Sequence, residues 1–411
     1  MSQVSRTPAV PPTAGPGTIG PGAATHPAAA RAALDPVGLG AATHPSADPT
    51  DPSTTANPAA AAQVVVDRLR AGHRARGRRA LLVTAVLVVL LAVLLAASLL
   101  LDLGGRIPPG EVLPAAFGLR DGLPDYVIHR IRLPRALTAL LAGGLFGLSG
   151  ALYQRLIRNP LATPDIVGIS AGAGAGAATV LLFVPAFAYG VQVAAVGGAV
   201  AMVTLVLALS RTRDGVDTYR LVLVGIGMSA VCVAYVNYLF TLAGQQGVAQ
   251  VMRWLVGSTN DATWDGVHVL TASLAGCGLG AALLGRSLNG LALGDQLAAG
   301  LGNRVALTRT ATLLLGAAAA ALATSVTGPI GFVSLISGPI AVRLVGADRA
   351  VALAVPTGAV IVLGADVLAQ HAPLISPVPT GVLTALIGTP SFVWLLLRRP
   401  RGARTTPGTR P

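Results

Sequence analysis

The chain of 411 residues is 53% hydrophobic and only 11% charged, and its mean hydropathy is +0.70. This composition excludes an ordinary soluble globular protein. All 29 basic residues are arginine, so mechanisms that need a lysine, such as a Walker A phosphate loop or a Schiff base, are also excluded. The net charge of +13 does not indicate a nucleic acid partner, because the arginines lie at the edges of apolar runs, where membrane topology explains them.

Both ends of the chain differ from its apolar middle. Residues 1–66 are rich in Ala, Pro, Thr and Gly without a helical or strand period, so we expect a disordered cytoplasmic tail. This tail is not a signal peptide, because the first apolar run begins about 80 residues into the chain. Residues 67–79 form a basic juxtamembrane segment, and residues 400–411 form a second basic, disordered tail.

Between the tails, residues 80–399 are expected to form a transmembrane permease domain. A helix needs roughly 20 apolar residues to cross a bilayer, and the sequence predicts an all-α polytopic membrane protein with about ten such helices. Both termini are then in the cytoplasm. The helices are expected at 80–101, 136–156, 166–186, 190–209, 220–242, 266–285, 308–327, 331–346, 350–369 and 380–397.

The arginines test this topology, because cytoplasmic loops of membrane proteins carry an excess of basic residues. The predicted topology places 23 arginines inside and 6 outside, which supports it. Arg130, Arg132 and Arg135 are an anomaly, because they cluster on the outer side just before the second span. Three explanations stay open: a wrongly assigned topology, anchoring to lipid headgroups, or a site for an acidic partner.

Small residues are frequent in the predicted spans, where they let helix backbones approach closely. Helix packing explains them better than contact with a transported substrate. The glycines that we single out for packing or for the pathway are Gly143, Gly147, Gly150, Gly172 and Gly174. Charge within the spans is nearly absent, and Asp366 near the outer end of the ninth span is the clearest case. This scarcity argues against proton relays and voltage sensing.

Two short strings match catalytic motifs by chance. Gly168–Gly172 fits the nucleophile elbow, which requires a strand, a turn and a helix on an α/β sheet, whereas this string opens a predicted membrane helix. Gly147–Gly150 fits an intramembrane serine protease, which would need a histidine at similar depth on a facing helix, and no histidine lies mid-membrane. Cys232 and Cys277 lie in separate apolar segments and form no metal motif. We therefore expect no enzyme activity, no metal and no cofactor.

A series of motifs follows in fixed order along residues 125–399. The series comprises R-I-R-L-P-R and R-N-P-L-A-T-P-D-I-V-G-I-S-A-G within Arg130–Gly172, R-L-V-L-V-G-I-G-M-S from Arg220, R-W-L-V-G-S from Arg253, L-A-L-G-D from Leu291, G-P-I-G-F from Gly328 and V-L-T-A-L-I-G-T-P from Val382. The ordered series resembles the FecCD-type permease subunits of bacterial ABC importers for ferric siderophores and vitamin B12. This resemblance implies the fold of the vitamin B12 permease and a multi-pass location in the bacterial plasma membrane.

The resemblance also implies partners. A second permease subunit, identical or paralogous, would complete a translocation pathway in the lipid bilayer. Two cytoplasmic ATPase subunits would bind and hydrolyse ATP, and an extracytoplasmic substrate-binding (lipo)protein would deliver the cargo. The family's ATPase coupling loop corresponds here to Leu293, Gly294, Asp295, Leu301 and Gly302. The family's docking arginines for the binding protein correspond to Arg132 and Arg135.

Two positions depart from the family pattern. Many members carry Pro-His in the eighth helix where this chain has Gly338-Pro339, so the family's details are not carried over at the cytoplasmic part of that helix. Some relatives have a third outer arginine four residues after the aspartate of the ninth span. This chain has Gln370 there, which suggests a different arrangement for docking.

The sequence does not name the siderophore, because an apolar pathway contacts its cargo loosely. It nevertheless predicts the permease subunit of an ATP-driven importer that forms the translocation pathway for iron-siderophore complexes. Vitamin B12 or haem is the alternative cargo, because the same scaffold serves all three. Two other classes are distant alternatives. A secondary transporter would need buried coupling-ion ligands and internal repeats, and an intramembrane protease would need the missing histidine.

Overall fold

The computed structural model describes residues 58–101, 110, 114, 122–184, 189–212, 215–371 and 378–397. The chain divides into two compact units, Met1–Val64 and Val65–Pro411. In the first unit the described part is the helical stretch from Pro58. The predicted disorder of residues 1–57 and of the basic tail 400–411 lies outside the described residues.

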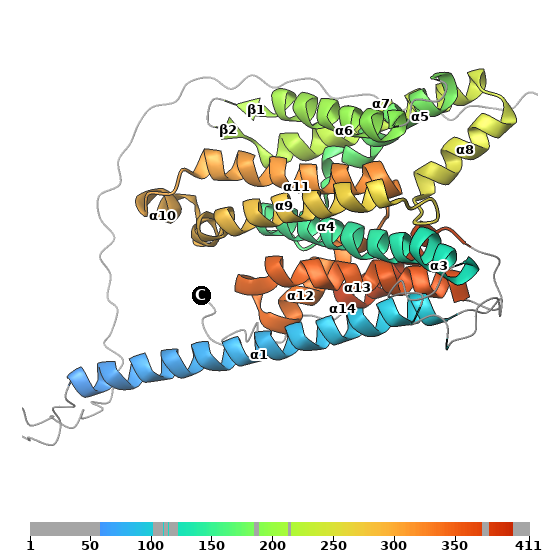
Figure 1. Ribbon diagram of the computed structural model, residues 1–411. Helices are drawn as coiled ribbons and strands as arrows, with labels where there is room; N and C mark the ends of the chain where they lie inside the picture. Colours follow the sequence, from blue (N-terminus) through green and yellow to red (C-terminus); the bar gives the residue numbers. More distant parts are fainter. Residues whose placement is uncertain are drawn as a thin grey trace, which may run out of the picture. The chain divides into compact units, whose positions relative to one another are not determined.

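The described residues form helices and one short hairpin, as Figure 1 shows. The long helices are α1 (Pro58–Leu100), α4 (Leu133–Ile157), α6 (Gly190–Leu209), α7 (Thr218–Leu242), α9 (Trp264–Leu291), α11 (Val305–Thr327) and α13 (Ala350–His371). The shorter helices are α3 (Leu123–Val127), α5 (Ile169–Phe183), α8 (Gln245–Val256), α10 (Asp295–Gly300), α12 (Val333–Val345) and α14 (Thr380–Leu397). The remaining elements are the π-helical turn η1 (Ile128–Arg132), the 3₁₀ turns η2 (Pro164–Val167) and η3 (Ala347–Arg349), and the antiparallel strands β1 (Arg211–Thr212) and β2 (Gly215–Val216).

Each predicted apolar segment coincides with a helix; the ends agree for 190–209 and 380–397 and are shifted for the others. Helix α1 differs most, because it begins at Pro58 and includes the basic segment 67–79. Residues 58–66 are therefore helical, not part of the disordered tail that we predicted. The physical reason is that alanine and arginine are strong helix formers, so the apolar helix continues into the basic segment without a break.

Seven helices in the described residues are long and apolar enough to cross a membrane. They are Arg76–Leu100, Pro124–Ile157, Gly190–Leu209, Tyr219–Leu242, Trp264–Leu291, Val305–Thr327 and Ala347–Gln370. Three further apolar helices are shorter, namely Ile169–Phe183, Val333–Val345 and Thr380–Val393. The all-α polytopic architecture is thus confirmed, whereas the number of about ten spans stays a prediction.

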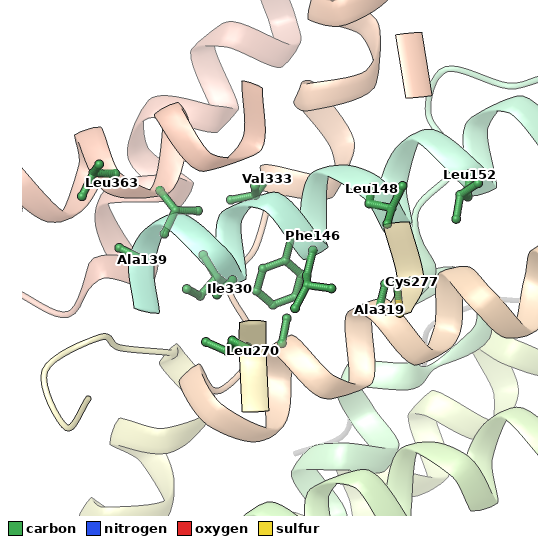
Figure 2. Close-up of a cluster of buried hydrophobic side chains, with 14 of the residues drawn as sticks. Ala139, Phe146, Leu148, Leu152, Leu270, Cys277, Ala319, Ile330, Val333 and Leu363 are labelled. Atoms are coloured by element: carbon green, nitrogen blue, oxygen red, sulfur yellow. The ribbon is translucent and has the colours of Figure 1, made fainter. Parts of the chain in front are cut away.

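Helix α4 is the most enclosed of the long helices, with 83% of its most apolar stretch buried. It packs against α9, α11, α12 and α13. Figure 2 shows this core, in which Phe146 of α4 lies among Leu270 of α9 and Ile330 from the turn between α11 and α12. Most other core residues are Ala, Leu and Val, whose compact side chains suit close packing between helices.

A second cluster joins α5, α6, α7 and α11. Helices α5 and α6 approach closely, because alanines pack between them and an added Cβ atom at Gly172 or Gly176 would overlap the backbone of α6. Helices α1 and α7, in contrast, have only 11% and 17% of their apolar stretches buried within the chain. Their exposed apolar faces are suited to lipid or to another membrane subunit.

The two ends of the helix bundle carry different elements. Helix α10 and the β1–β2 hairpin lie at one end, and α3 and α8 lie at the other (Figure 1). Arg155, Arg158 and Arg309 are at or near the α10 end. Because basic residues are enriched on the cytoplasmic side, we call the α10 end the inner end and the α3–α8 end the outer end.

Candidate functional site

The inner end presents a row of exposed leucines in the connection between α9 and α11. Leu293, Leu297 and Leu301 are 59%, 63% and 72% exposed. Leu297 and Leu301 are four residues apart at α10, and this spacing places side chains on one face of a helix, whereas Leu293 lies just before the helix begins. A row of large apolar side chains on an aqueous surface marks a contact surface for another protein.

Two glycines and one carboxylate set the shape of this segment. Gly294 (φ +107°) and Gly302 (φ +82°) have left-handed backbone conformations on either side of α10, which favour glycine. Asp295 begins α10 and accepts hydrogen bonds from Nη2 of Arg309 at 2.8 and 3.0 Å, and Arg158 lies 3.6 Å from the same carboxylate. The structure therefore brings the predicted coupling residues into one anchored segment: Leu293, Gly294, Asp295, Leu301 and Gly302.

The two outer arginines predicted to dock a binding protein have partners inside the chain. Nη1 of Arg132 donates to the carbonyl oxygen of Leu99 at 2.6 Å, which joins η1 to the end of α1. Arg135, whose side chain is 18% exposed, forms an ion pair with the buried Asp366 of α13, with 2.9 Å between Nη2 and Oδ1. Their docking role stays a prediction, and Arg135 has in addition a structural partner that the sequence did not reveal.

Asp366 is the centre of a buried polar cluster at the outer end. Its carboxylate accepts hydrogen bonds from Nε and Nη2 of Arg135 at 3.1 and 2.9 Å, Oγ1 of Thr259 at 2.5 Å, Nε2 of Gln370 at 2.6 Å and Oγ1 of Thr380 at 3.0 Å. The donors come from α4, the α8–α9 connection, α13 and α14, so the cluster ties four segments together. A buried carboxylate needs such donors to offset its lost hydration. Gln370, a departure from the family pattern, is one of them.

The five glycines predicted for packing or the pathway lie at close helix contacts. At each one, an added Cβ atom would come within 3 Å of an atom on a neighbouring element. The neighbours are Gly358 for Gly143, Ala354 for Gly147, Ser334 for Gly150, Gly198 for Gly172 and Leu255 for Gly174. These positions therefore serve packing within the chain, and contact with a transported substrate stays a prediction.

A glutamine supports the proline-containing helix α12. Pro339 has no N–H, so the carbonyl oxygen of Leu335 one turn earlier lacks its usual helical donor. Nε2 of Gln154 on α4 donates to the carbonyl oxygens of Leu335 at 3.0 Å and Ser334 at 3.1 Å. Gly338 provides the room, because a Cβ atom there would overlap Oε1 of Gln154. The Gly338-Pro339 departure is thus accommodated by the side chain of Gln154.

A cavity of about 340 Å³ lies between α4, α5, α8, α11, α12 and α14. Its lining is largely apolar, with Phe146 and Phe332 as the largest side chains. The polar side chains in the lining are Asp165, Ser170 and Ser334. A second cavity of about 320 Å³ lies between α5, α6 and α7 and has a mainly apolar lining.

Sequence reasoning missed helix α8 and the roles of two polar side chains. Helix α8 has Val248, Val251 and Leu255 at helical spacing, which is a signal that could have identified it. Gln154 and Asp165 carry no such signal, because the partners of Gln154 lie on a helix distant in the chain and Asp165 faces a cavity that several helices form together. Their roles become visible only when the helices are packed.

The fold and these sites define a multi-span membrane transport subunit with a protein-contact segment at its inner end. Residues 87–398 match the model of the FecCD transport family. The chain belongs to this family, as the ordered motifs of the sequence predicted. It is therefore the permease subunit of an ABC importer, and its many apolar helices place it in the cell membrane.

Permeases with similar sequences align with most of the chain. The ferric enterobactin transport system permease protein FepG of Escherichia coli is 32% identical over 324 residues, which are 79% of this chain and 98% of FepG. The achromobactin transport system permease protein CbrC of Dickeya dadantii is 35% identical over 327 residues, 79% of this chain and 92% of CbrC. A solved structure described as an inward-facing conformation of a metal-chelate type ABC transporter has a similar fold, with a TM-score of 0.66 and 27% sequence identity. The matched region comprises 76% of this chain and 97% of the chain in that structure.

Proposed function

We propose that this permease subunit forms the translocation pathway for iron-siderophore complexes. The observation that carries the proposal is the similarity, over nearly the whole length of the relatives, to permeases named for ferric enterobactin and achromobactin. Vitamin B12 and haem are the alternative cargoes, because other relatives are named for the transport of hemin and vitamin B12.

Uptake by a strain that lacks the gene tests the cargo. Radiolabelled iron is supplied on a panel of siderophores, with vitamin B12 and haem as parallel substrates. We expect the deletion to abolish iron uptake from at least one siderophore and the restored gene to recover it. Unchanged iron uptake together with lost vitamin B12 or haem uptake would reverse the assignment.

We further infer that one of two cytoplasmic ATPase subunits binds the segment Leu293–Gly302, and that the ATPase subunits, not this chain, bind and hydrolyse ATP. The exposed leucine row supports this role, because its position at the inner end faces the compartment where ATP is available. The ion pair between Asp295 and Arg309 also supports this role. It fixes the segment to α11, so a movement of the bound ATPase would be transmitted to a membrane helix. The permease itself then performs no chemistry.

Two substitutions in this segment test the ATPase contact. Leu297→Glu places a charge on the leucine row, and Asp295→Arg breaks the anchoring ion pair and sets three positive charges together. We expect both variants to insert normally, yet to lose co-purification with the ATPase subunits and stimulation of their activity. Asp67→Arg, an exposed charge reversal on α1, is the matched control. Normal co-purification and transport by both variants would show that the segment is only a solvated connector.

The remaining partners are a second permease subunit and an extracytoplasmic binding protein. Support for the former comes from the exposed apolar faces of α7 and α14, which the described part of the chain leaves uncovered. Support for the latter comes from Arg132 of the R-L-P-R motif at the outer end, where an acidic protein would find a complementary charge, whereas the charge of Arg135 is already paired with Asp366. Whether the second permease is another copy or a paralogue is read directly from the composition of the purified complex.

A further inference from the structure

The connection between α4 and α5 re-enters the helix bundle. The carbonyl oxygen of Ile166 lies against Gly225, where an added Cβ atom would overlap it. Gly225 is two turns into α7, about 10 Å from the beginning of that helix at 1.5 Å per residue. Val167 is buried as well. Asp165, which the sequence placed in an inner loop, therefore lies within the depth of the membrane-crossing helices.

Asp165 faces the cavity of about 340 Å³ described above. Its side chain is exposed to that cavity, and Ser170 of α5, also in the lining, donates a hydrogen bond from Oγ to Oδ1. Within the described part of the chain, no arginine is paired with this carboxylate. The rest of the lining is mainly apolar, so one negative group dominates the charge of the cavity.

A carboxylate at membrane depth is unfavourable unless it has a counter-charge, and such a residue most often serves a function. A structural account also exists, because Asp165 precedes the N-terminus of α5, whose partial positive charge stabilises an anion. That account explains why the charge is tolerated. It does not require the carboxylate and its serine partner to face an open cavity between α5, α8, α12 and α14.

We propose that Asp165, held by Ser170, is an acceptor site on the cargo pathway that favours chelates carrying a positively charged or ammonium-bearing group. This inference rests on the proposed function, because it assigns the class of iron chelate that the permease accepts. The carboxylate attracts a cationic cargo that enters this mainly apolar cavity, whereas it repels a chelate with net negative charge. Neutral chelates should be accepted less readily than cationic ones and more readily than anionic ones.

A matched pair of cargoes tests the proposal. One is a ferric trihydroxamate with a terminal ammonium group, and the other is the same chelate with that amine acetylated, which removes one positive charge and leaves the iron centre unchanged. Initial uptake rates are measured in the complemented deletion strain, so that the binding protein is the same throughout. We expect the ratio of the ammonium to the acetylated rate to fall by about fivefold in Asp165→Asn, as expected for the loss of one screened charge interaction.

Two further variants keep this test independent of folding. Asp165→Glu retains the charge and should retain the ratio, and Asp348→Asn, an exposed acid outside the cavity, should leave the ratio unchanged. Membrane abundance is measured for every variant. A purely structural role for Asp165 predicts lower abundance and an equal loss for both chelates, so an unchanged ratio in Asp165→Asn would overturn the proposal. If the wild-type permease takes up neither chelate nor any other iron chelate, the proposed function itself fails, and this inference fails with it.

Discussion

At the scale of single residues, buried polar side chains hold the helices of this permease together through a few hydrogen bonds. Gln154 and Asp366 are both buried and both bond to segments far away in the sequence. In a membrane interior, a polar group that loses its partner has no water to replace it. Each such residue is therefore a point at which a small change has a large effect.

Replacing Gln154 with alanine should lower the stability of the permease. The carbonyl oxygen of Leu335 would lose the donor that compensates for Pro339, and an unsatisfied buried polar group costs about 1–3 kcal/mol. The measurement is the thermal unfolding midpoint of the purified protein in detergent. Gln250→Ala on the exposed surface of α8 is the control and should not shift the midpoint. An equal midpoint for Gln154→Ala and wild type would refute the compensation.

Breaking the outer ion pair on one side should be more harmful than removing it altogether. Asp366→Leu leaves the guanidinium of Arg135 without its partner, and loss of one member of a buried pair costs about 3–5 kcal/mol. The double variant Arg135→Met/Asp366→Leu removes both charges and should recover part of that loss. Unfolding midpoints of the two single variants and the double variant form the cycle. If the losses in unfolding midpoint simply add, the two side chains are not energetically coupled.

At the scale of the elements, glycines set how closely α4 approaches its neighbours. A Cβ atom at Gly150 would overlap the carbonyl oxygen of Ser334, so Gly150→Ala must push α4 and α12 apart. Such overpacking costs about 1–3 kcal/mol. Gly276 on α9 has open space around it, so Gly276→Ala should be neutral or stabilise the helix by up to about 1 kcal/mol. Similar unfolding midpoints for the two variants would contradict this difference.

The sequence predicts the helices well where a single signal dominates. Long apolar runs identify the spans because bilayer thickness demands them, and the glycines of α4 are found because small residues recur along it. Helix α8 is missed because an amphipathic helix of 12 residues has no length signal. The partners of Asp366 and the position of Asp165 are missed because they depend on which helices meet, and that is decided by three-dimensional packing.

At the scale of the whole molecule, the described chain leaves surfaces that another protein or lipid must cover. Helices α1 and α7 are apolar yet mostly exposed, and the leucine row of α10 is exposed at the inner end. These surfaces fit a permease that works within an assembly. The outer arginines differ from these apolar surfaces, because they would attract a partner by charge.

The structure changes how the docking role of the outer arginines is tested. Arg135→Glu would place two carboxylates together in the buried cluster of Asp366, so lost uptake by that variant would report damage to the fold. Arg132 donates to the backbone carbonyl of Leu99 and, unlike Arg135, lies outside the buried cluster of Asp366, so Arg132→Glu is the more informative change. We expect Arg132→Glu to insert normally and to bind the binding protein more weakly, with a difference from wild type that grows at low ionic strength.

The affinity of the binding protein for the permease in nanodiscs is the measurement that decides between docking and anchoring. If Arg132 docks the partner, Arg132→Glu lowers this affinity by slowing association, because charges at the rim of an interface steer the encounter. If Arg132 anchors the outer end to lipid headgroups, its loss lowers membrane abundance and leaves the affinity unchanged. Ser258→Ala, at another partly exposed outer position, is the control and should alter neither quantity. An unaltered affinity with reduced abundance would assign Arg132 to the membrane surface, not to the binding protein.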